Sequence, residues 1–264
     1  MRKSLLFVLA AASAATCFGA IKGTITKTDG VTQKGEIRWS SRDKAYVITA
    51  GRIETQVPAT DVEEMNIEKP AGFDKAADSV DKGQGASAIP VLEKIVKEYQ
   101  RLQWDKEAGG YLARAYLDAG KADQALKACQ TIISSDSTAA YNGKLAPAYW
   151  EALFQLGQMS KLEAALKRAA ASGDRASSGA ALIKRGDIVY KEGKETKDAA
   201  RKALVDGYLR AVLMYTEPGV AEQVRPEALY KAARCFEKLD QASRADQYRT
   251  ELRNTYKTSP WASK

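Results

Sequence analysis

Residues 106–136 contain the feature that most constrains the fold, a pair of amphipathic helices joined by a very short turn. Leu112, Ala115 and Tyr116 recur at the spacing of one helix face. Gly120 then interrupts the pattern, and glycine can take the left-handed conformation that ends a helix. The second apolar stripe consists of Ala125, Leu126, Cys129, Ile132 and Ile133. A hairpin this short cannot enclose a core alone, so we expect it to stack on similar units.

Similar units recur along the chain. Glycines end the first helix of four successive hairpins, and their residue numbers differ by 37, 37 and 36. These glycines are Gly83, Gly120, Gly157 and Gly193. Asp240 and Gln241 take the same place in a fifth unit. Such a period is typical of a helical repeat array, in which each unit buries its apolar face against the next.

The repeated pattern resembles the tetratricopeptide repeat, a helix–turn–helix unit with a Leu-Gly-x-x-Tyr core and an alanine after the turn. The matching residues are Leu112, Ala113, Tyr116, Gly120, Ala125 and Cys129 in the second unit, Gly186, Gly193, Leu204, Tyr208 and Ala211 in the fourth, and Ala233, Phe236, Ala245 and Leu252 in the last. Trp150 departs from the pattern, because it stands where a small residue usually faces the neighbouring helix. The resemblance covers residues 71–257 and implies an array that binds protein partners.

The resemblance also implies where a partner would bind, since the first helix of each such unit lines the concave face. The candidate residues on that face are Arg114, Leu117, Asp118, Glu151, Phe154, Gln155, Asp187, Tyr190, Lys191, Arg234, Glu237 and Lys238. Their alternating charges around Phe154 and Tyr190 suit an extended peptide or a partner helix, because aromatic anchors supply energy and charges set the register. The competing interpretation is a solvated face whose two aromatic side chains pack sideways into neighbouring helices.

Residues 21–68 have the alternating period of strands. Five short strands are predicted at residues 21–25, 35–39, 46–49, 53–57 and 62–67. We expect them to close into a small SH3-like β-barrel, because closure hides the edge strands. Trp39 is interpreted as a core residue of that barrel, and the alternative is an exposed binding pair with Tyr46.

Residues 1–20 have the order of a signal peptide. Arg2 and Lys3 precede an apolar run over residues 5–15, and small residues follow it. The run is too short to span a bilayer. We expect export to the periplasm, with cleavage before Ala20 or Ile21. The alternative is a lipoprotein anchored through Cys17.

Composition limits the chemistry of the chain. It has no histidine among 264 residues, which excludes histidine-based acid–base relays and histidine metal ligands. Cys17, Cys129 and Cys235 form no Cys-x-x-Cys pair. The net charge of +8 is not gathered into a basic block, so nucleic acid is not an expected partner. We therefore predict a protein that is not an enzyme and binds no cofactor or metal.

The sequence predicts three parts: a signal peptide in residues 1–20, a small β module in 21–70 and a tetratricopeptide-like array in 71–264. The fold class is mainly α, an α-solenoid of about five helix hairpins preceded by a five-stranded β-barrel-like module. The leading hypothesis is an exported protein–protein interaction scaffold that binds a peptide or partner helix on its concave face. The alternative is cell-wall glycan or peptide binding by the β module, with the array as a spacer. Both fit peripheral association with the outer membrane or cell wall.

Overall fold

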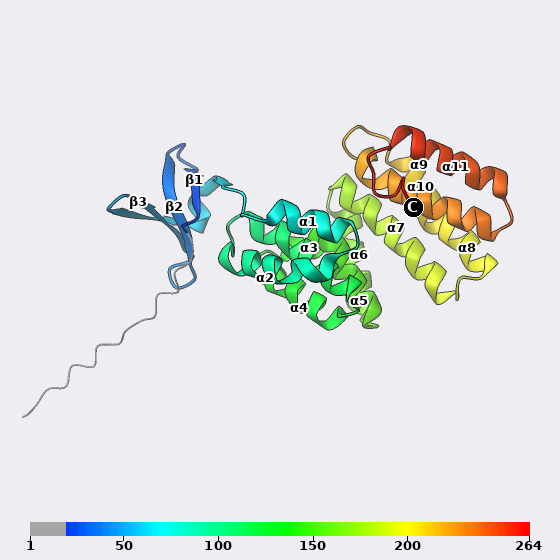
Figure 1. Ribbon diagram of the computed structural model, residues 1–264, viewed down its shortest axis with the longest axis horizontal. Helices are drawn as coiled ribbons and strands as arrows, with labels where there is room; N and C mark the ends of the chain where they lie inside the picture. Colours follow the sequence, from blue (N-terminus) through cyan, green and yellow to red (C-terminus); the bar gives the residue numbers. More distant parts are fainter. Residues whose placement is uncertain (1–19) are drawn as a thin grey trace, which may run out of the picture. The chain divides into compact units, whose positions relative to one another are not determined.

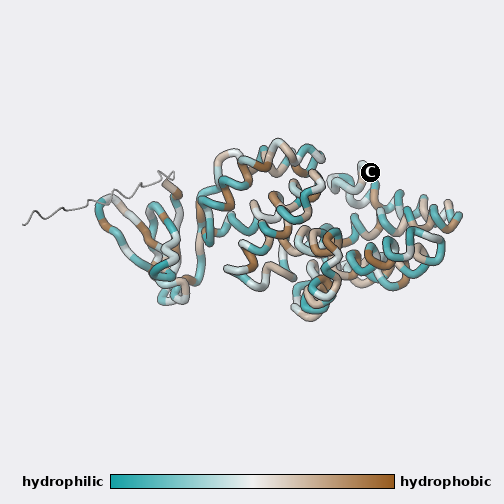
Figure 2. Tube along the Cα trace, turned by 90° about the horizontal axis from the view of Figure 1, so that it is seen from below, coloured by the Kyte–Doolittle hydropathy of each residue, from teal (hydrophilic) through white to brown (hydrophobic). Residues whose placement is uncertain are grey.

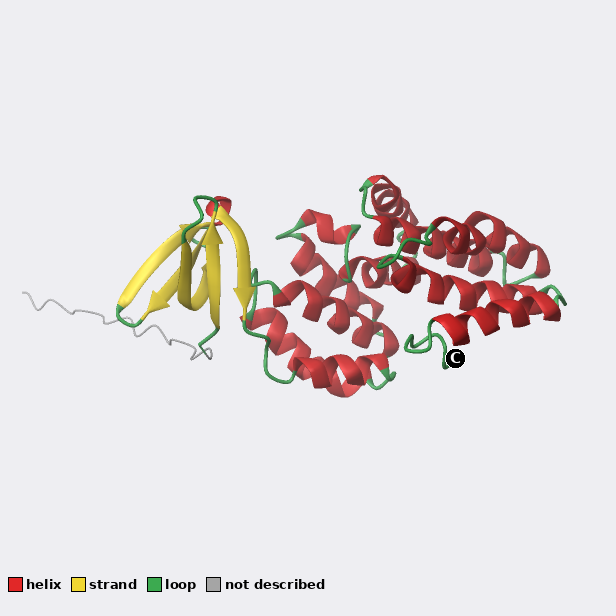
Figure 3. Cartoon of the chain, turned by 90° about the horizontal axis from the view of Figure 1, so that it is seen from above, coloured by secondary structure: helices red, strands yellow, loops and turns green. Residues whose placement is uncertain are grey.

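The computed structural model describes residues 20–264, so the predicted signal peptide and Cys17 lie outside the described residues. The chain divides into two compact units, residues 1–68 and 69–264. The first is a β-sheet and the second consists of helices (Figure 3). Within residues 20–264, we find no helix with the length and apolar character that a membrane span needs.

The sheet is antiparallel, with the strand order β4-β3-β2-β1-β5. Its strands are β1 (Lys22–Lys27), β2 (Thr32–Ser40), β3 (Ala45–Ala50), β4 (Ile53–Pro58) and β5 (Val62–Ile67). Turn residues Gly30 and Gly51 have φ angles of 80° and 63°, which glycine adopts without a steric penalty. The five predicted strands are therefore confirmed as strands.

The predicted closure into a barrel is wrong. Within residues 20–68, β4 pairs with β3 alone and β5 with β1 alone, so both remain edge strands. One residue from each strand points to the same face and is at most 3% exposed: Ile25, Ile37, Ile48, Val57 and Ile67. The apolar face of the sheet is thus buried although the sheet does not close into a barrel. Trp39 is half-buried and packs edge-on against Tyr46, with ring centroids 4.9 Å apart.

The second unit is a series of helix hairpins, as predicted (Figure 1). The hairpins pair α1 (Phe73–Asp81) with α2 (Ile89–Glu98), α3 (Trp104–Asp118) with α4 (Ala122–Ile133), and α5 (Leu145–Gln155) with α6 (Met159–Ala171). Then α7 (Arg175–Glu192) pairs with α8 (Lys197–Ala203), which continues through a π-helical turn (Leu204–Tyr208) into α9 (Leu209–Met214). The last pair is α10 (Ala221–Lys238) and α11 (Ala242–Thr255).

The turns inside these hairpins are left-handed. Gly83, Gly120 and Gly157 have φ angles of 74°, 70° and 66°. The fourth turn differs, because Gly193 has a φ of −77° and the neighbouring Lys194 and Glu195 take positive values instead. Gly193 is needed there for space, since a Cβ at this position would lie 2.4 Å from the Cβ of Ala199.

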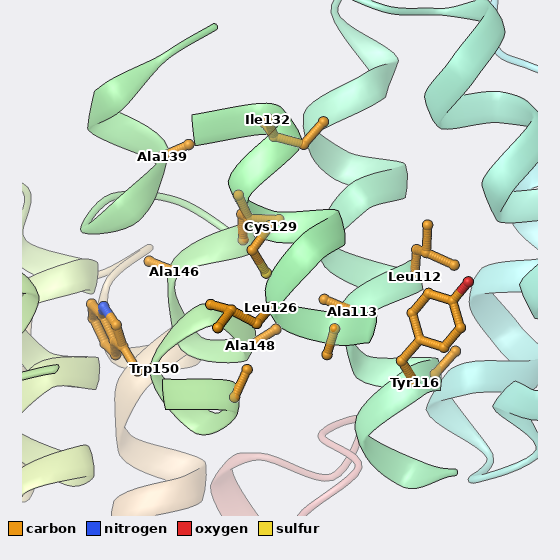
Figure 4. Close-up of a cluster of buried hydrophobic side chains, with 14 of the residues drawn as sticks. Leu112, Ala113, Tyr116, Leu126, Cys129, Ile132, Ala139, Ala146, Ala148 and Trp150 are labelled. Atoms are coloured by element: carbon orange, nitrogen blue, oxygen red, sulfur yellow. The ribbon is translucent and has the colours of Figure 1, made fainter. Parts of the chain in front are cut away.

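Two hydrophobic clusters form the core of the helical unit. The first runs from Phe73 to Ala181 and the second from Leu182 to Leu252, so α7 contributes to both. Along the trace, apolar and polar residues alternate on each helix (Figure 2). In the first cluster, α4 lies between α3 and α5 and presents Leu126, Cys129 and Ile132 (Figure 4). Trp150 is 1% exposed there, and its Nε1 donates a hydrogen bond to the Ala140 carbonyl at 2.9 Å.

Candidate functional site

The first helices of the hairpins border a large hollow, which we call the first-helix hollow. Its volume is about 1030 Å³. The end of α1, the middle of α3, the start of α5 and Glu227 of α10 line it together with residues 258–264. Tyr111 supplies an aromatic wall, with its ring 5.7 Å from that of Phe73 and 5.4 Å from the Arg114 guanidinium. The hollow therefore offers both charged and aromatic groups.

A smaller hollow of about 370 Å³ lies between α3 and α5. It shares Arg114, Asp118 and Pro147 with the first-helix hollow, so the two adjoin. Five of the predicted partner-binding residues line it: Arg114, Leu117, Asp118, Glu151 and Gln155. The structure thus brings together the candidates from the second and third hairpins.

The other predicted residues line neither hollow. Phe154 is half-buried beneath the Lys184 ammonium, 4.7 Å from its ring centroid, and Tyr190 packs on the second hydrophobic cluster. Burial raises the pKa of Tyr190. The remaining residues are the half-buried Asp187 and the exposed Lys191, Arg234, Glu237 and Lys238.

An ion pair joins each first helix to the next along the array. The pairs are Asp81–Arg114, Glu107–Lys144, Glu151–Lys184 and Asp187–Lys231, hereafter the ion-pair series. The first and last have N–O distances of 2.9 and 2.7 Å. Of the predicted partner-binding residues, Arg114, Glu151 and Asp187 are therefore paired through this series. Lys191 and Glu237 are paired elsewhere, with Glu195 and Arg249.

Burial and these pairs shift the pKa values of several groups. Burial by itself favours protonated Glu151, but the Lys184 ammonium and hydrogen bonds from Lys184 and Gln155 hold its pKa below the usual value. The hydrogen bond to Glu107 raises the pKa of Lys144. Burial raises the pKa of Tyr111, and the nearby Asp81 carboxylate adds to this. Each group therefore keeps its ordinary charge near neutral pH.

Of the residues that line the first-helix hollow, the predicted set contained Arg114 and Asp118 and missed the others, among them Tyr111, Pro147 and Trp261. Tyr111 stands three residues before Arg114, and Pro147 stands four before Glu151. Extending the count by one helical turn would have found both. Trp261 follows the last helix, where no periodicity indicates which way a side chain points.

The described residues carry no arrangement suited to metal binding, since within 20–264 no group of three acidic or cysteine side chains could hold an ion. Gly83-Gln84-Gly85 follows helix α1 rather than a strand, so it is not a dinucleotide-binding loop. What the hollow can do is contact another chain through aromatic, charged and main-chain groups.

Part of the helical unit matches a known protein family. Residues 79–147 match the tetratricopeptide repeat. The match runs from the end of α1 to the start of α5 and contains the α3–α4 hairpin, which supplies Tyr111, Arg114 and Asp118 to the hollow. Units four and five, which also resemble the repeat, lie outside it. No curated protein matches the chain.

Tetratricopeptide repeats form protein–protein interaction scaffolds and are typically not catalytic, and no enzyme family was found. Residues 79–147 are thus similar to an interaction module.

Proposed function

We propose that this protein is an exported, non-enzymatic scaffold that binds a partner peptide or helix in the first-helix hollow. The supporting observation is that the hollow is built on α3, the central first helix of the matched repeat, and combines Tyr111 with accessible charges. Asp118 is the main candidate for contact with a partner. It is exposed, borders both hollows and has no ion-pair partner among the described residues. A partner could therefore pair with it without breaking an internal contact.

The experiment is affinity capture from cell-envelope extract with matched variants of the mature protein. Asp118→Lys reverses a charge in the hollow, whereas Lys167→Glu reverses one on the exposed face of α6 as a control. Both should keep the stability of the parent within about 0.5 kcal/mol, as exposed substitutions usually do. Proteins that bind the parent and Lys167→Glu but not Asp118→Lys support the proposal. Equal capture by all three contradicts it.

Export rests on the order of charge, apolar run and small residues before Ile21. Mass spectrometry of protein from its native host should find an N-terminus at Ala20 or Ile21. A retained Met1 would contradict export. A lipid mass on an N-terminal Cys17 would support anchoring to a membrane instead.

The sheet supplies a second candidate function, the binding of a cell-wall peptide or glycan. The edge strand β4 has free main-chain groups and carries Ile53, which is 70% exposed. An edge of this kind can take up an extended peptide as an additional strand. Deletion of residues 21–68 separates the candidates, because capture that survives the deletion belongs to the helical unit.

A further inference from the structure

Residues 258–264 already occupy part of the proposed binding surface. Thr258, Pro260, Trp261, Ser263 and Lys264 line the first-helix hollow and form one of its walls. The segment follows α11 and returns to α10, where it lies beside the end marked C in Figure 1. A segment of this chain therefore lies at the place where the proposed function puts a peptide of a partner protein.

Trp261 is the aromatic side chain that holds this segment to the helices, and Ala262 packs on the same hydrophobic cluster. The Trp261 ring is half-buried, 5.3 Å from the Tyr230 ring and 5.8 Å from the Lys231 ammonium. We call Tyr230 and Lys231 the aromatic seat. Lys264 covers the outer side of the same indole, with its ammonium 4.1 Å from the ring. Cations near an indole ring are attracted to it, so both lysines favour this placement.

The hydrogen bonds of the segment are all local. The Ala262 amide donates to the Ser259 carbonyl, the Ser263 hydroxyl to the Pro260 carbonyl, and the Ser259 amide to the Tyr256 carbonyl. Within the described part of the chain, no hydrogen bond or ion pair ties residues 258–264 to α1, α3, α5 or α10. Departure of the segment would thus break apolar and cation–π contacts of Trp261 and Ala262 without leaving buried polar groups unpaired.

The aromatic seat would survive departure of the segment. Lys231 keeps its position because Asp187 accepts from it at 2.7 Å and Glu227 at 2.6 Å. Despite burial, these two carboxylates raise the pKa of Lys231, which keeps it charged. Tyr230 lies on the same helix, and Arg234 is 6.0 Å from its ring. The seat is a prebuilt surface for one aromatic ring.

We propose that residues 258–264 are a displaceable internal ligand, and that the external partner is a peptide with an aromatic anchor followed by a basic residue. The internal segment shows this chemistry, with Trp261 on the seat and Lys264 folded over it. The partner would displace the segment and extend into the widened hollow toward Tyr111 and Asp118. This inference rests on the proposed function for the identity of the site and adds the partner's chemical class and a means of control.

The test uses a synthetic, fluorescently labelled peptide of residues 256–264 and three chains: the parent, the chain ending at Lys257, and full-length Trp261→Ala. A tethered segment competes at an effective concentration in the millimolar range. We therefore expect the peptide to bind both altered chains at least about tenfold more tightly than the parent. A peptide with alanine in place of Trp261 should bind none of them.

Thermal unfolding shows whether the shortened chain remains folded, and Trp261→Ala provides the same measurement in a chain of full length. Absence of binding to both altered chains would overturn the inference, and so would equal binding of the alanine peptide. Dimer formation by the parent through exchanged segments would point to a second copy as the occupant and would also overturn it. The assay uses no envelope partner, so its failure leaves the capture result with Asp118→Lys intact, and the reverse is equally true.

Discussion

In the first half of the helical unit, α1–α6, neighbouring hairpins pack through apolar side chains such as Leu126 and Trp150. The second half, α7–α11, has its own hydrophobic cluster and in addition a polar network around Asp187. Tyr208 donates to Asp187 at 2.8 Å, and Asp187 also accepts from Lys231. Both halves are therefore packed through apolar side chains, and the second half adds directional polar contacts at its centre.

The two halves also differ in how closely their helices approach. At the π-helical turn of the second half, Gly207 lies directly against Gly186 of α7. A Cβ on Gly207 would be 2.7 Å from the Gly186 Cα, a distance that real structures do not show. The family match lies entirely in the first half. In the second half, the closeness of this helix crossing depends on two glycines.

Gly207→Ala should have the largest effect on stability. The new methyl group meets main-chain atoms of α7 that cannot rotate away, so the helices must separate, at about 3 kcal/mol. The matched change in the first half is Gly109→Ala, whose Cβ would meet only the movable Ile132 side chain, at 3.0 Å, and Leu145. There the gain in helix propensity, about 1 kcal/mol, offsets the crowding. Urea unfolding of both variants measures the two changes in the free energy of unfolding. Similar losses of stability would contradict the expected difference between the two halves.

Asp187→Ala should cost about 2 kcal/mol, because Tyr208 and Lys231 lose a charged partner in a half-buried site. Its counterpart, Asp81→Ala, removes an ion pair whose side chains are more than 40% exposed, so the loss should stay below about 1 kcal/mol. Thermal unfolding of the two variants gives the comparison. A greater loss for Asp81→Ala would place the stronger polar contact in the first half.

Ala125→Leu and Ala245→Leu compare an interior hairpin with the last one. Both alanines are at most 1% exposed, at the close approach of two helices, so a larger side chain should cost about 1–3 kcal/mol. Damage to the interior hairpin also weakens an interface on each side. We therefore expect the lower unfolding temperature for Ala125→Leu. A neutral Ala125→Leu would contradict the packing described for α3 and α4.

Cys129 and Cys235 allow the two halves to be followed without any substitution. Both thiols are free and buried, and burial raises the pKa of each to about 12. The reactive thiolate is therefore scarce at pH 8, so labelling reports local opening. With rising urea, we expect Cys235 to be labelled before Cys129, because terminal hairpins lack one neighbour. Peptide mass spectrometry measures the extent of labelling at each cysteine. Labelling of both cysteines at the same urea concentration would indicate that the two halves unfold as a single cooperative unit.

Much of the fold could be predicted because periodicity states which side chains must be buried. The glycine spacing indicated four hairpins, its continuation to Asp240 and Gln241 indicated the fifth, and alternation indicated the five strands. Barrel closure was a wrong prediction, since alternation reports that a face is apolar but not how its edges pair. At the fourth turn, the pattern placed Gly193 correctly but not the left-handed residues, which are Lys194 and Glu195.

Less of the candidate site could be predicted. Counting along first helices indicated the side that carries Arg114 and Glu151, but not that each has a partner on the next helix. Such pairing depends on the offset between hairpins, which a single-helix pattern does not contain. Whether the twelve predicted residues bind a partner stays a prediction. No sequence periodicity indicates where the Trp261 side chain lies, because its position follows from the path of the chain after α11.

The ion-pair series has a mechanical consequence. The first two pairs are more exposed than the last: the side chains of Asp81 and Arg114 are 44% and 45% exposed and those of Glu107 and Lys144 are 32% and 69% exposed, whereas those of Asp187 and Lys231 are 22% and 19% exposed. Dissolved ions screen exposed pairs far more than buried ones. Higher ionic strength should therefore loosen the links among α1, α3 and α5 while the link from α7 to α10 stays firm. At high ionic strength, the α1–α5 part of the array would therefore be more flexible than the α7–α10 part. Residues at the end of α1, in α3 and at the start of α5 line the first-helix hollow.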